Sequence, residues 1–222
     1  MRGHVARRAP LSTPLSTALR EGSRVEHEAA EGSAFVTALL AGRVTVEGYA
    51  TYLRRLRPVY AAMESVGRSR LFDPWVAAVH DPAVERLAAI DADLAHWSPA
   101  RPDQETTPVV SAYVERLEAT SAWGGLFVAH HYTRYLGDLS GGQALGHAVR
   151  QHLGGATPGS PGTAFYSFPD IPRPKPWKDA YRARLDALGA TESEVERVVE
   201  EVRVAFRLNR ALLEELAHDV DC

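Results

Sequence analysis

Three glycines occur close together in a segment that otherwise has the pattern of a helix. They are Gly137, Gly141 and Gly142. The second and third lie four and five positions after the first, about one helical turn, so they fall on one side of the helix. Because glycine has no Cβ, the main chain there can touch a flat molecule. Tight packing against another helix is the more ordinary reason for such spacing, and a surface for a planar ligand is the alternative.

Charged side chains and a histidine could add chemistry to this surface. Arg134 and Asp138 are one helical turn apart, which by itself is typical of a structural salt bridge. His27 lies on the apolar stripe of an earlier helix, where a lone histidine is more often structural than a ligand. Arg20 and Arg24 precede it by about two turns and one turn, a spacing ordinarily found on a solvated charged face.

The elements that must position these residues are helices separated by turns rich in proline and glycine. N-cap residues followed by proline, or a capping box, mark most helix starts. We predict helices that begin at Thr13-Pro14, Thr45, Asp81-Pro82, Thr107-Pro108 and Thr191. The first continues to Ala34, and the second contains Pro58, which should kink it.

The glycine-bearing segment itself, residues 123–153, predicts a kinked helix, because each interior glycine costs roughly 1 kcal/mol relative to alanine. Residues 154–176 are rich in glycine and proline and predict a long surface connection. Only residues 164–168 show a brief strand-like alternation. We therefore predict an all-α fold with a single domain over residues 14–218, a flexible leader at 1–13 and a tail at 219–222.

Composition excludes several classes of protein. The chain has 222 residues, 45% hydrophobic and 24% charged, which is ordinary for a folded domain. A formal net charge of −3 argues against nucleic acid or an anionic membrane as a partner. The single cysteine, Cys222, excludes an intrachain disulfide and fits a reducing cytoplasmic setting. No run of 18 apolar residues occurs, so we expect no membrane anchor.

The segment YTRYLGDLSGGQ, residues 132–143, resembles the signature of the haem oxygenases. The resemblance covers nearly the whole chain, from about Leu15 to Leu216. Residues 20–27 resemble the family's proximal helix and residues 60–64 its second helix, and two later segments, 177–182 and 206–209, also match.

This resemblance implies a fold and an activity. The fold is a multi-helical bundle that holds haem between a proximal helix and a kinked distal helix. The activity is that of an enzyme for which haem b is both cofactor and substrate. It uses O2 and electrons to open the ring, and the products are biliverdin, carbon monoxide and ferrous iron. Such a reaction serves haem catabolism, and iron acquisition, bilin supply and haem detoxification all remain open as its purpose.

The resemblance also implies roles for residues on the proximal side and at the haem edge. His27 matches the axial ligand, which supplies a neutral imidazole nitrogen to the iron. Four cations match the anchors of the two propionates, and a tyrosine matches a residue near them. They are Arg20, Arg24, Lys178, Arg182 and Tyr132. The family commonly has lysine at the first two positions, and arginine keeps the charge while adding bidentate geometry.

On the distal side, Asp138 matches an aspartate that acts through water, so that a proton is delivered without a strong acid directly above the oxygen. Arg134 and Tyr60 match its hydrogen-bonding partners, and these three are the expected catalytic residues. Six further residues are expected to contact the haem: Gly137, Ser140, Gly141, Gly142, Phe206 and Asn209.

Two other functions are open to an all-α chain of this kind. A haem carrier or sensor would need only His27 and the basic residues, so the presence of Asp138 with its partners favours the enzyme. A di-iron oxidase would need two Glu-x-x-His motifs and two further carboxylates. The sequence has one such motif at residues 215–218 and an aspartate version at 93–96, which is too few.

The chain contains no flavin or iron–sulfur motif, so its electrons must come from a separate protein. We expect a ferredoxin, a flavodoxin or a reductase, docked where the four cations form a basic patch at the haem edge. We also expect the chain to act as a monomer.

Overall fold

The computed structural model describes residues 13–100, 105–154, 157 and 160–219, and these form helices joined by turns. The α-helices are α1 (Leu15–Gly22), α2 (Arg24–Glu31), α3 (Ala34–Leu40), α4 (Val46–Ser69), α5 (Pro74–Val79), α6 (Leu87–Trp97), α7 (Pro108–Ala119), α8 (Gly124–Asp138), α9 (Gly142–Leu153), α10 (Pro174–Asp186) and α11 (Glu192–Asp219). Three 3₁₀ turns are η1 (Pro82–Val84), η2 (Thr120–Ala122) and η3 (Ala164–Tyr166). The described residues contain no strand, which confirms the all-α class; residues 164–168 lie around η3 rather than in a strand.

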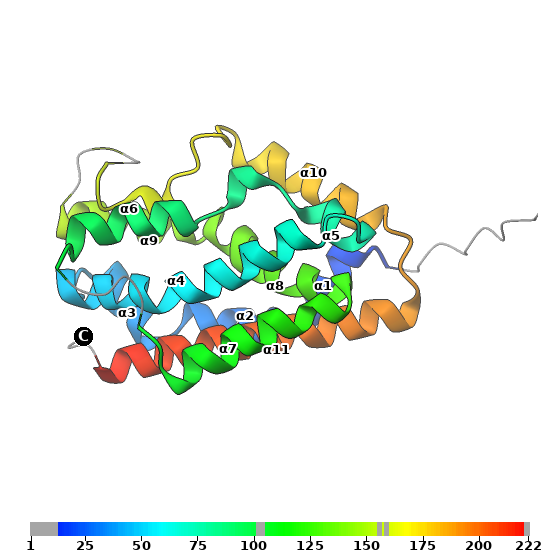
Figure 1. The fold of residues 1–222 in the computed structure, drawn as a ribbon, viewed down its shortest axis with the longest axis horizontal. Coiled ribbons are helices and arrows are strands. Elements are labelled where there is room, and N and C mark those ends of the chain that lie inside the picture. The colour runs from blue at the N-terminus through cyan, green and yellow to red at the C-terminus, as the bar shows by residue number, and fades with distance from the viewer. Residues whose placement is uncertain (1–12, 101–104, 155–156, 158–159, 220–222) are drawn as a thin grey trace, which may run out of the picture.

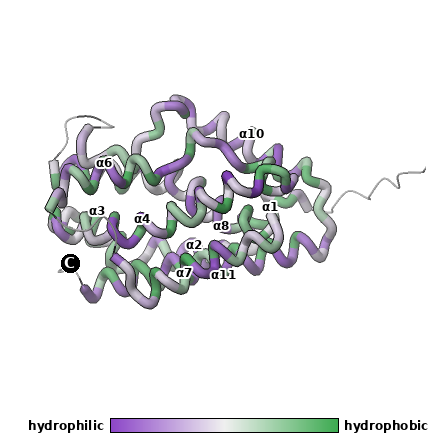
Figure 2. Tube along the Cα trace, viewed as in Figure 1, coloured by the Kyte–Doolittle hydropathy of each residue, from purple (hydrophilic) through white to green (hydrophobic). Residues whose placement is uncertain are grey.

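The helices form an elongated bundle in which α4, α7 and α11 follow the long axis (Figure 1). Helix α11 packs against α1, α2, α3, α7 and α8, and α4 packs against α6, α7 and α8. Hydrophilic and hydrophobic residues alternate along the helices (Figure 2), as expected when each helix turns one face to a shared core. The two longest helices therefore support both the N-terminal helices and α8.

Three of the five predicted helix starts have the expected cap, whereas α1 begins at Leu15 after Pro14 without a side-chain cap. The Thr45 hydroxyl accepts a hydrogen bond from the Gly48 amide, and the Thr107 hydroxyl accepts one from Val110. At the start of α11, Thr191 and Glu194 form the predicted capping box, each side chain accepting from the other's amide. Helix α4 runs from Val46 to Ser69 with Pro58 inside it.

Three helix boundaries differ from the prediction. The helix expected to reach Ala34 ends at Gly22, because the Ser23 hydroxyl donates to the Leu19 carbonyl at 2.7 Å and Ser23 has a non-helical φ of −118°. Asp81 caps only the turn η1, and α6 begins at Leu87. Helix α5 was not predicted; its cap is Asp73, whose carboxylate accepts from the Trp75 amide.

The connection before α10 belongs to the core, so the prediction of a surface loop is wrong for its central part. Phe165 is fully buried and Tyr166 nearly so. The Asp93 carboxylate of α6 accepts hydrogen bonds from the amides of Ala164 and Phe165, both at 2.8 Å. Two charge-assisted bonds thus fix a segment whose composition resembles that of a loop.

A buried polar link joins α7, α8 and α11. Glu201 is 3% exposed, and its carboxylate contacts His130 Nε2 at 2.8 Å and accepts two hydrogen bonds from Arg116. Burial alone would raise the pKa of Glu201, but the hydrogen bonds from His130 and Arg116 outweigh it and lower the pKa to about 2. The ionised carboxylate therefore contributes to the stability of the fold.

The first prediction concerns this link. A carboxyl whose pKa is lower in the folded state than in the unfolded state stabilises the folded state. This stabilisation is complete at pH values above the unfolded-state pKa, and it is lost as the pH falls towards the folded-state pKa. We expect Glu201→Gln to lower the free energy of unfolding at pH 7 by about 2 to 3 kcal/mol. In urea unfolding, the difference from wild type should shrink as the pH drops from about 5 towards 2.

Glu200→Gln is the matched control, because Glu200 pairs with Arg203 and Arg207 at the exposed surface of the same helix. It should leave the stability nearly unchanged. A Glu201→Gln effect that is constant over the acidic range would show that the charge at this position does not matter.

Candidate active site

The carboxylate of Asp138 lies at the C-terminal end of α8 and is 7% exposed. The hydroxyl of Tyr60, from the middle of α4, donates to its Oδ2 at 2.5 Å. Arg134, one turn earlier on α8, places Nη2 3.9 Å from Oδ1. The structure thus brings together all three residues expected to be catalytic.

Arg134 is itself held by two other helices. Its Nε and Nη2 donate to the Tyr60 hydroxyl at 3.1 and 2.8 Å, and its Nη1 donates to the Asn209 side chain of α11. The sequence placed Asn209 among the haem contacts without a partner. In the structure it anchors the guanidinium that faces Asp138.

Burial sets the electrostatics of this network. It raises the pKa of Asp138, while the charge of Arg134 and the hydrogen bond from Tyr60 oppose the rise. Burial also raises the pKa of Tyr60 well above its usual value, so its hydroxyl stays protonated and remains a donor. The raised pKa makes Asp138 a readier proton acceptor than an exposed aspartate.

The distal helix is interrupted directly after Asp138, where α8 ends, and α9 begins at Gly142 after three intervening residues. Gly137 is exposed, and a Cβ built on it would meet no atom within 4 Å. A Cβ on Gly141 would have only the Glu31 carboxylate near it, at 3.7 Å. Gly142 differs: it is buried, and its Cβ would lie 3.5 Å from the Tyr166 ring. The first two glycines border open space, and the third serves helix packing.

His27 lies on the other side of this space, on α2. Its side chain is 51% exposed, its ring packs edge-on against Phe206 of α11 at 5.6 Å, and its Nε2 is 3.6 Å from the Glu31 carboxylate. Glu31 is thus near both His27 and Gly141, which places α2 opposite the break in the distal helix. Sequence reasoning did not single out Glu31, although its position four residues after His27 is a signal for contact.

The predicted cations come from α1, α2 and α10. Arg20 and Arg24 are highly exposed and have only loose ion pairs, with Glu21 and Glu28 of their own segment. Burial raises the pKa of Tyr132, and the charges of Arg182 and Arg20 oppose the rise, so positive groups from two helices lie near this hydroxyl.

Lys178 of α10 contacts the distal break directly. Its ammonium donates to the Ser140 hydroxyl at 2.8 Å, and burial together with the neighbouring Arg182 lowers the pKa of Lys178. Arg182 makes an exposed ion pair with Asp179 at 3.2 Å. Lys178 therefore already holds the segment between α8 and α9, and the exposed guanidinium of Arg182 is available to a ligand.

The residues around this space fit haem b. The half-exposed imidazole of His27 and Gly141 of the distal break lie beside the same Glu31 carboxylate, and Lys178, with Arg182 close to it, supplies a cation at that break. The carboxylates of the two motifs considered for a di-iron site already accept structural hydrogen bonds. Glu215 accepts from Arg55 and Thr107, and Asp93 fixes the turn before α10.

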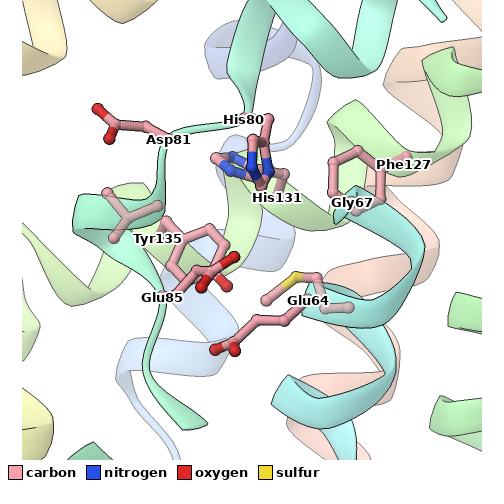
Figure 3. A pocket seen from close by; sticks show the side chains of 10 residues that line it. Glu64, Gly67, His80, Asp81, Glu85, Phe127, His131 and Tyr135 are labelled. Carbon is pink, nitrogen blue, oxygen red and sulfur yellow. The ribbon is translucent and has the colours of Figure 1, made fainter. Parts of the chain in front are cut away.

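A separate small cavity lies between α4, α8 and residues 80–85, with room for about one water molecule (Figure 3). Glu64, His80, His131 and Tyr135 are among its lining residues. None of the predicted haem contacts lines it, and a space of this size cannot hold a haem.

Comparison with known proteins agrees with this geometry. The family model described as heme oxygenase matches residues 13–215. The chain belongs to the haem oxygenase family. It is 35% identical to heme oxygenase 2 of Synechocystis, covering 92% of this chain and 83% of that protein. It is 38% identical to human heme oxygenase 1, covering 91% of this chain and 71% of the human protein.

Solved structures of the family have the same fold. The crystal structure of Synechocystis heme oxygenase-2 in complex with heme and NO superposes with a TM-score of 0.86 at 35% identity, covering 92% of this chain and 85% of that one. The heme oxygenase of Leptospira interrogans gives 0.85 at 33% identity, covering 91% of this chain and 100% of that one. This haem oxygenase is thus an oxidoreductase that degrades haem, with haem as substrate and cofactor. Within the described residues, no helix is long and apolar enough to cross a membrane.

The second prediction concerns the Tyr60–Asp138 hydrogen bond. Tyr60→Phe removes a donor that favours the carboxylate, so the pKa of Asp138 should rise further. The measurement is an infrared pH titration of the haem-free protein, with the Asp138 carboxyl band assigned by its absence in Asp138→Asn. Tyr113→Phe is the control, because the Tyr113 hydroxyl is buried without a hydrogen-bond partner. A midpoint that stays in place or falls in Tyr60→Phe would refute the assigned role of the hydroxyl.

Proposed function

We propose that this chain cleaves haem b with O2 and externally supplied electrons, releasing biliverdin, carbon monoxide and ferrous iron. The observation that carries this proposal is the network of Tyr60, Arg134 and Asn209 around the buried Asp138 carboxylate. That network lies where the distal helix breaks, and Glu31 lies beside both His27 and Gly141 of that break.

In this proposal the haem is held from both faces and from its edge. His27 Nε2 is the donor to the iron, and the edge-on contact with Phe206 fixes the plane of the imidazole. Arg20, Arg24 and Arg182 pair with the propionates, and the hydroxyl of Tyr132 donates to one of them. Lys178 joins them while it holds Ser140. Gly137 and Gly141 allow the ring to approach the distal main chain.

When bound, the haem supplies both the iron that activates O2 and the ring carbon that is oxidised. Asp138 provides the proton handling for that chemistry. Its Oδ2 is occupied by the Tyr60 hydroxyl, whereas Oδ1 accepts no hydrogen bond from the residues that the structure describes, has Arg134 Nη2 at 3.9 Å and can hold a water. Arg134 keeps the carboxylate oriented and balances its charge. A proton can then pass from the carboxyl through that water instead of directly.

The same scaffold could carry haem without cleaving it, but a carrier has no use for a buried carboxylate that must be stabilised by three other side chains. The two functions are separated by anaerobic haem titration followed by addition of O2 and a reductant. Chromatographic detection of biliverdin supports the proposal. A Soret band that persists through repeated turnover conditions would contradict it.

Electrons are proposed to come from an acidic ferredoxin, flavodoxin or reductase. Arg20, Arg24 and Arg182 are exposed on one side of the site and would attract such a partner, so its association should weaken as salt is added. A monomer in the cytoplasm, with the catalytic domain over residues 14–218, is the form we propose for the active protein.

The third prediction tests the axial ligand. His27→Ala should still take up haem, because Phe206 and the cations remain, but it lacks the nitrogen donor. We expect a changed ferric haem spectrum, almost no biliverdin, and partial recovery of activity with added imidazole. His147→Ala, an exposed histidine of α9, should leave spectrum and product unchanged. Unchanged turnover in His27→Ala would remove His27 from the iron.

The fourth prediction concerns the position of ring opening. In-plane rotation of the haem is set by the cations that hold its propionates, and all four matched cations are present, so we expect biliverdin IXα. Arg182→Glu should repel a propionate and yield a mixture that includes β or δ isomers. Lys175→Glu reverses the same charge on the same helix at an exposed site and should keep the wild-type isomer. A wild-type product of mainly β or δ isomers would refute this seating.

A further inference from the structure

We propose that a stack of aromatic side chains conducts oxidising equivalents from the haem site to Trp177 at the protein surface, where an external reductant removes them. The stack consists of Tyr60, Tyr135, His131, Tyr181 and Trp177. This inference rests on the proposed function, because Tyr60 receives the oxidising equivalent only if haem binds beside Asp138. Its consequence is protection: a strong oxidant formed away from the productive reaction is discharged without damage to the site.

The stack is continuous from the site outward. The ring centroids of Tyr60 and Tyr135 are 5.9 Å apart, and those of Tyr135 and His131 are 4.5 Å apart. His131 and Tyr181 lie nearly parallel, at 13° and 5.6 Å, and Tyr181 and Trp177 follow at 28° and 5.3 Å. Figure 3 shows His131 and Tyr135 at the wall of the small cavity. Each ring is in contact distance of the next, so electron transfer crosses no aliphatic gap.

Three members of the stack have a proton acceptor within hydrogen-bond distance. This matters because a phenol or an indole that loses an electron becomes a strong acid. The Tyr60 hydroxyl faces Asp138 at 2.5 Å, the Tyr181 hydroxyl faces His131 Nδ1 at 3.1 Å, and Trp177 Nε1 donates to the Asp81 carboxylate at 2.7 Å. Burial lowers the pKa of His131 to about 3, so its imidazole is neutral and can accept.

The charges along the stack favour Trp177 as its end. The Arg184 guanidinium lies 5.9 Å from the Tyr181 ring and disfavours a positive charge there, whereas Trp177 is bonded to a carboxylate and is partly exposed. An oxidising equivalent that reaches Tyr181 is therefore passed on to Trp177.

A second aromatic series leads from Tyr60 towards Trp97, but it lacks a continuous run of oxidisable rings with proton acceptors beside them. It passes through Phe165, whose phenyl ring is far harder to oxidise than the imidazole of His131 and has no proton to exchange, at 5.5 Å from Tyr60 and 6.5 Å from Tyr52. It then needs Tyr49, whose buried hydroxyl has no hydrogen-bond partner. Trp97 therefore serves as the matched control for Trp177.

The electron balance uses hydrogen peroxide as the oxidant. One peroxide accepts two electrons and two protons and becomes two waters. Each electron leaves through Trp177, whose indole proton moves to Asp81 and returns when an external one-electron reductant of the ascorbate class reduces the radical. Two molecules of this reductant each give up one electron and one proton, which supplies the two electrons and two protons that the peroxide takes up, and the protein is unchanged at the end.

The test treats the ferric haem-loaded protein with hydrogen peroxide and a nitroso spin trap, followed by peptide mass spectrometry. We expect the main adduct on Trp177 and little on Trp97. Trp177→Phe should move the adduct inward to Tyr181 or Tyr135, and Trp97→Phe should change nothing. Tyr181→Phe, which interrupts the stack but leaves the indole in place, should reduce Trp177 labelling several-fold.

Equal labelling of Trp75, Trp97, Trp123 and Trp177 would indicate a freely diffusing oxidant and would overturn the inference. So would unchanged Trp177 labelling in Tyr181→Phe. A protein that makes biliverdin but leaves Trp177 unlabelled refutes the stack and leaves the proposed function intact.

A haem-free arm tests the stack independently of the proposed function. Gly137→Cys in a Cys222→Ser background offers one thiol beside the site, in the open space where a Cβ meets nothing. A ruthenium photo-oxidant is attached there, and flash excitation is followed by transient absorption. An indole radical that forms in this protein and is lost in Trp177→Phe supports the stack; a radical that persists in Trp177→Phe refutes it.

Discussion

A buried carboxylate is the constraint on which this site depends. Removing Asp138 from water is costly unless other groups satisfy its oxygens and its charge. Here the hydroxyl comes from α4, the guanidinium from α8 itself, and the amide that holds the guanidinium from α11. Three helices distant in sequence must therefore meet at the end of α8. The packing of α8 against α4 and α11 brings these side chains together. Glu201, about two turns before Asn209 on α11, strengthens the contact between α11 and α8 through His130.

Helix ends form both walls of the proposed haem site. On the distal wall, α8 stops at Asp138 and exposes main chain at Gly137 and Gly141. On the proximal wall, the break at Ser23 separates Arg20 from His27, so the cation and the imidazole lie on different helices. Lys178 spans the edge by bonding to Ser140. A contact of this kind, at a helix break, is where a small movement can open or close the site.

Much of this arrangement follows from local sequence, and the rest does not. Capping side chains such as Thr45, Thr107 and Thr191 act within one helical turn, so they could be predicted from the sequence. The segment 132–143 indicated the distal residues by its resemblance to the family. The break at Ser23 depends on a hydroxyl that bonds back to its own helix, without changing the apolar spacing. The burial of Phe165 depends on Asp93, 72 positions away. Gly142 faces the core because α8 has ended before it and Gly142 belongs to α9. The spacing of the three glycines assumed one uninterrupted helix and therefore could not predict this burial.

The most direct test of the central claim is the product formed by Asp138→Ala. The variant retains His27, the cations and the open distal main chain, so it should bind haem like wild type. Without the carboxylate, no water is held for controlled proton delivery, and oxidising equivalents should be diverted to peroxidase-type oxidation of an added donor. The account predicts normal haem uptake, loss of biliverdin and a gain of peroxidase activity; a normal yield of biliverdin would contradict it.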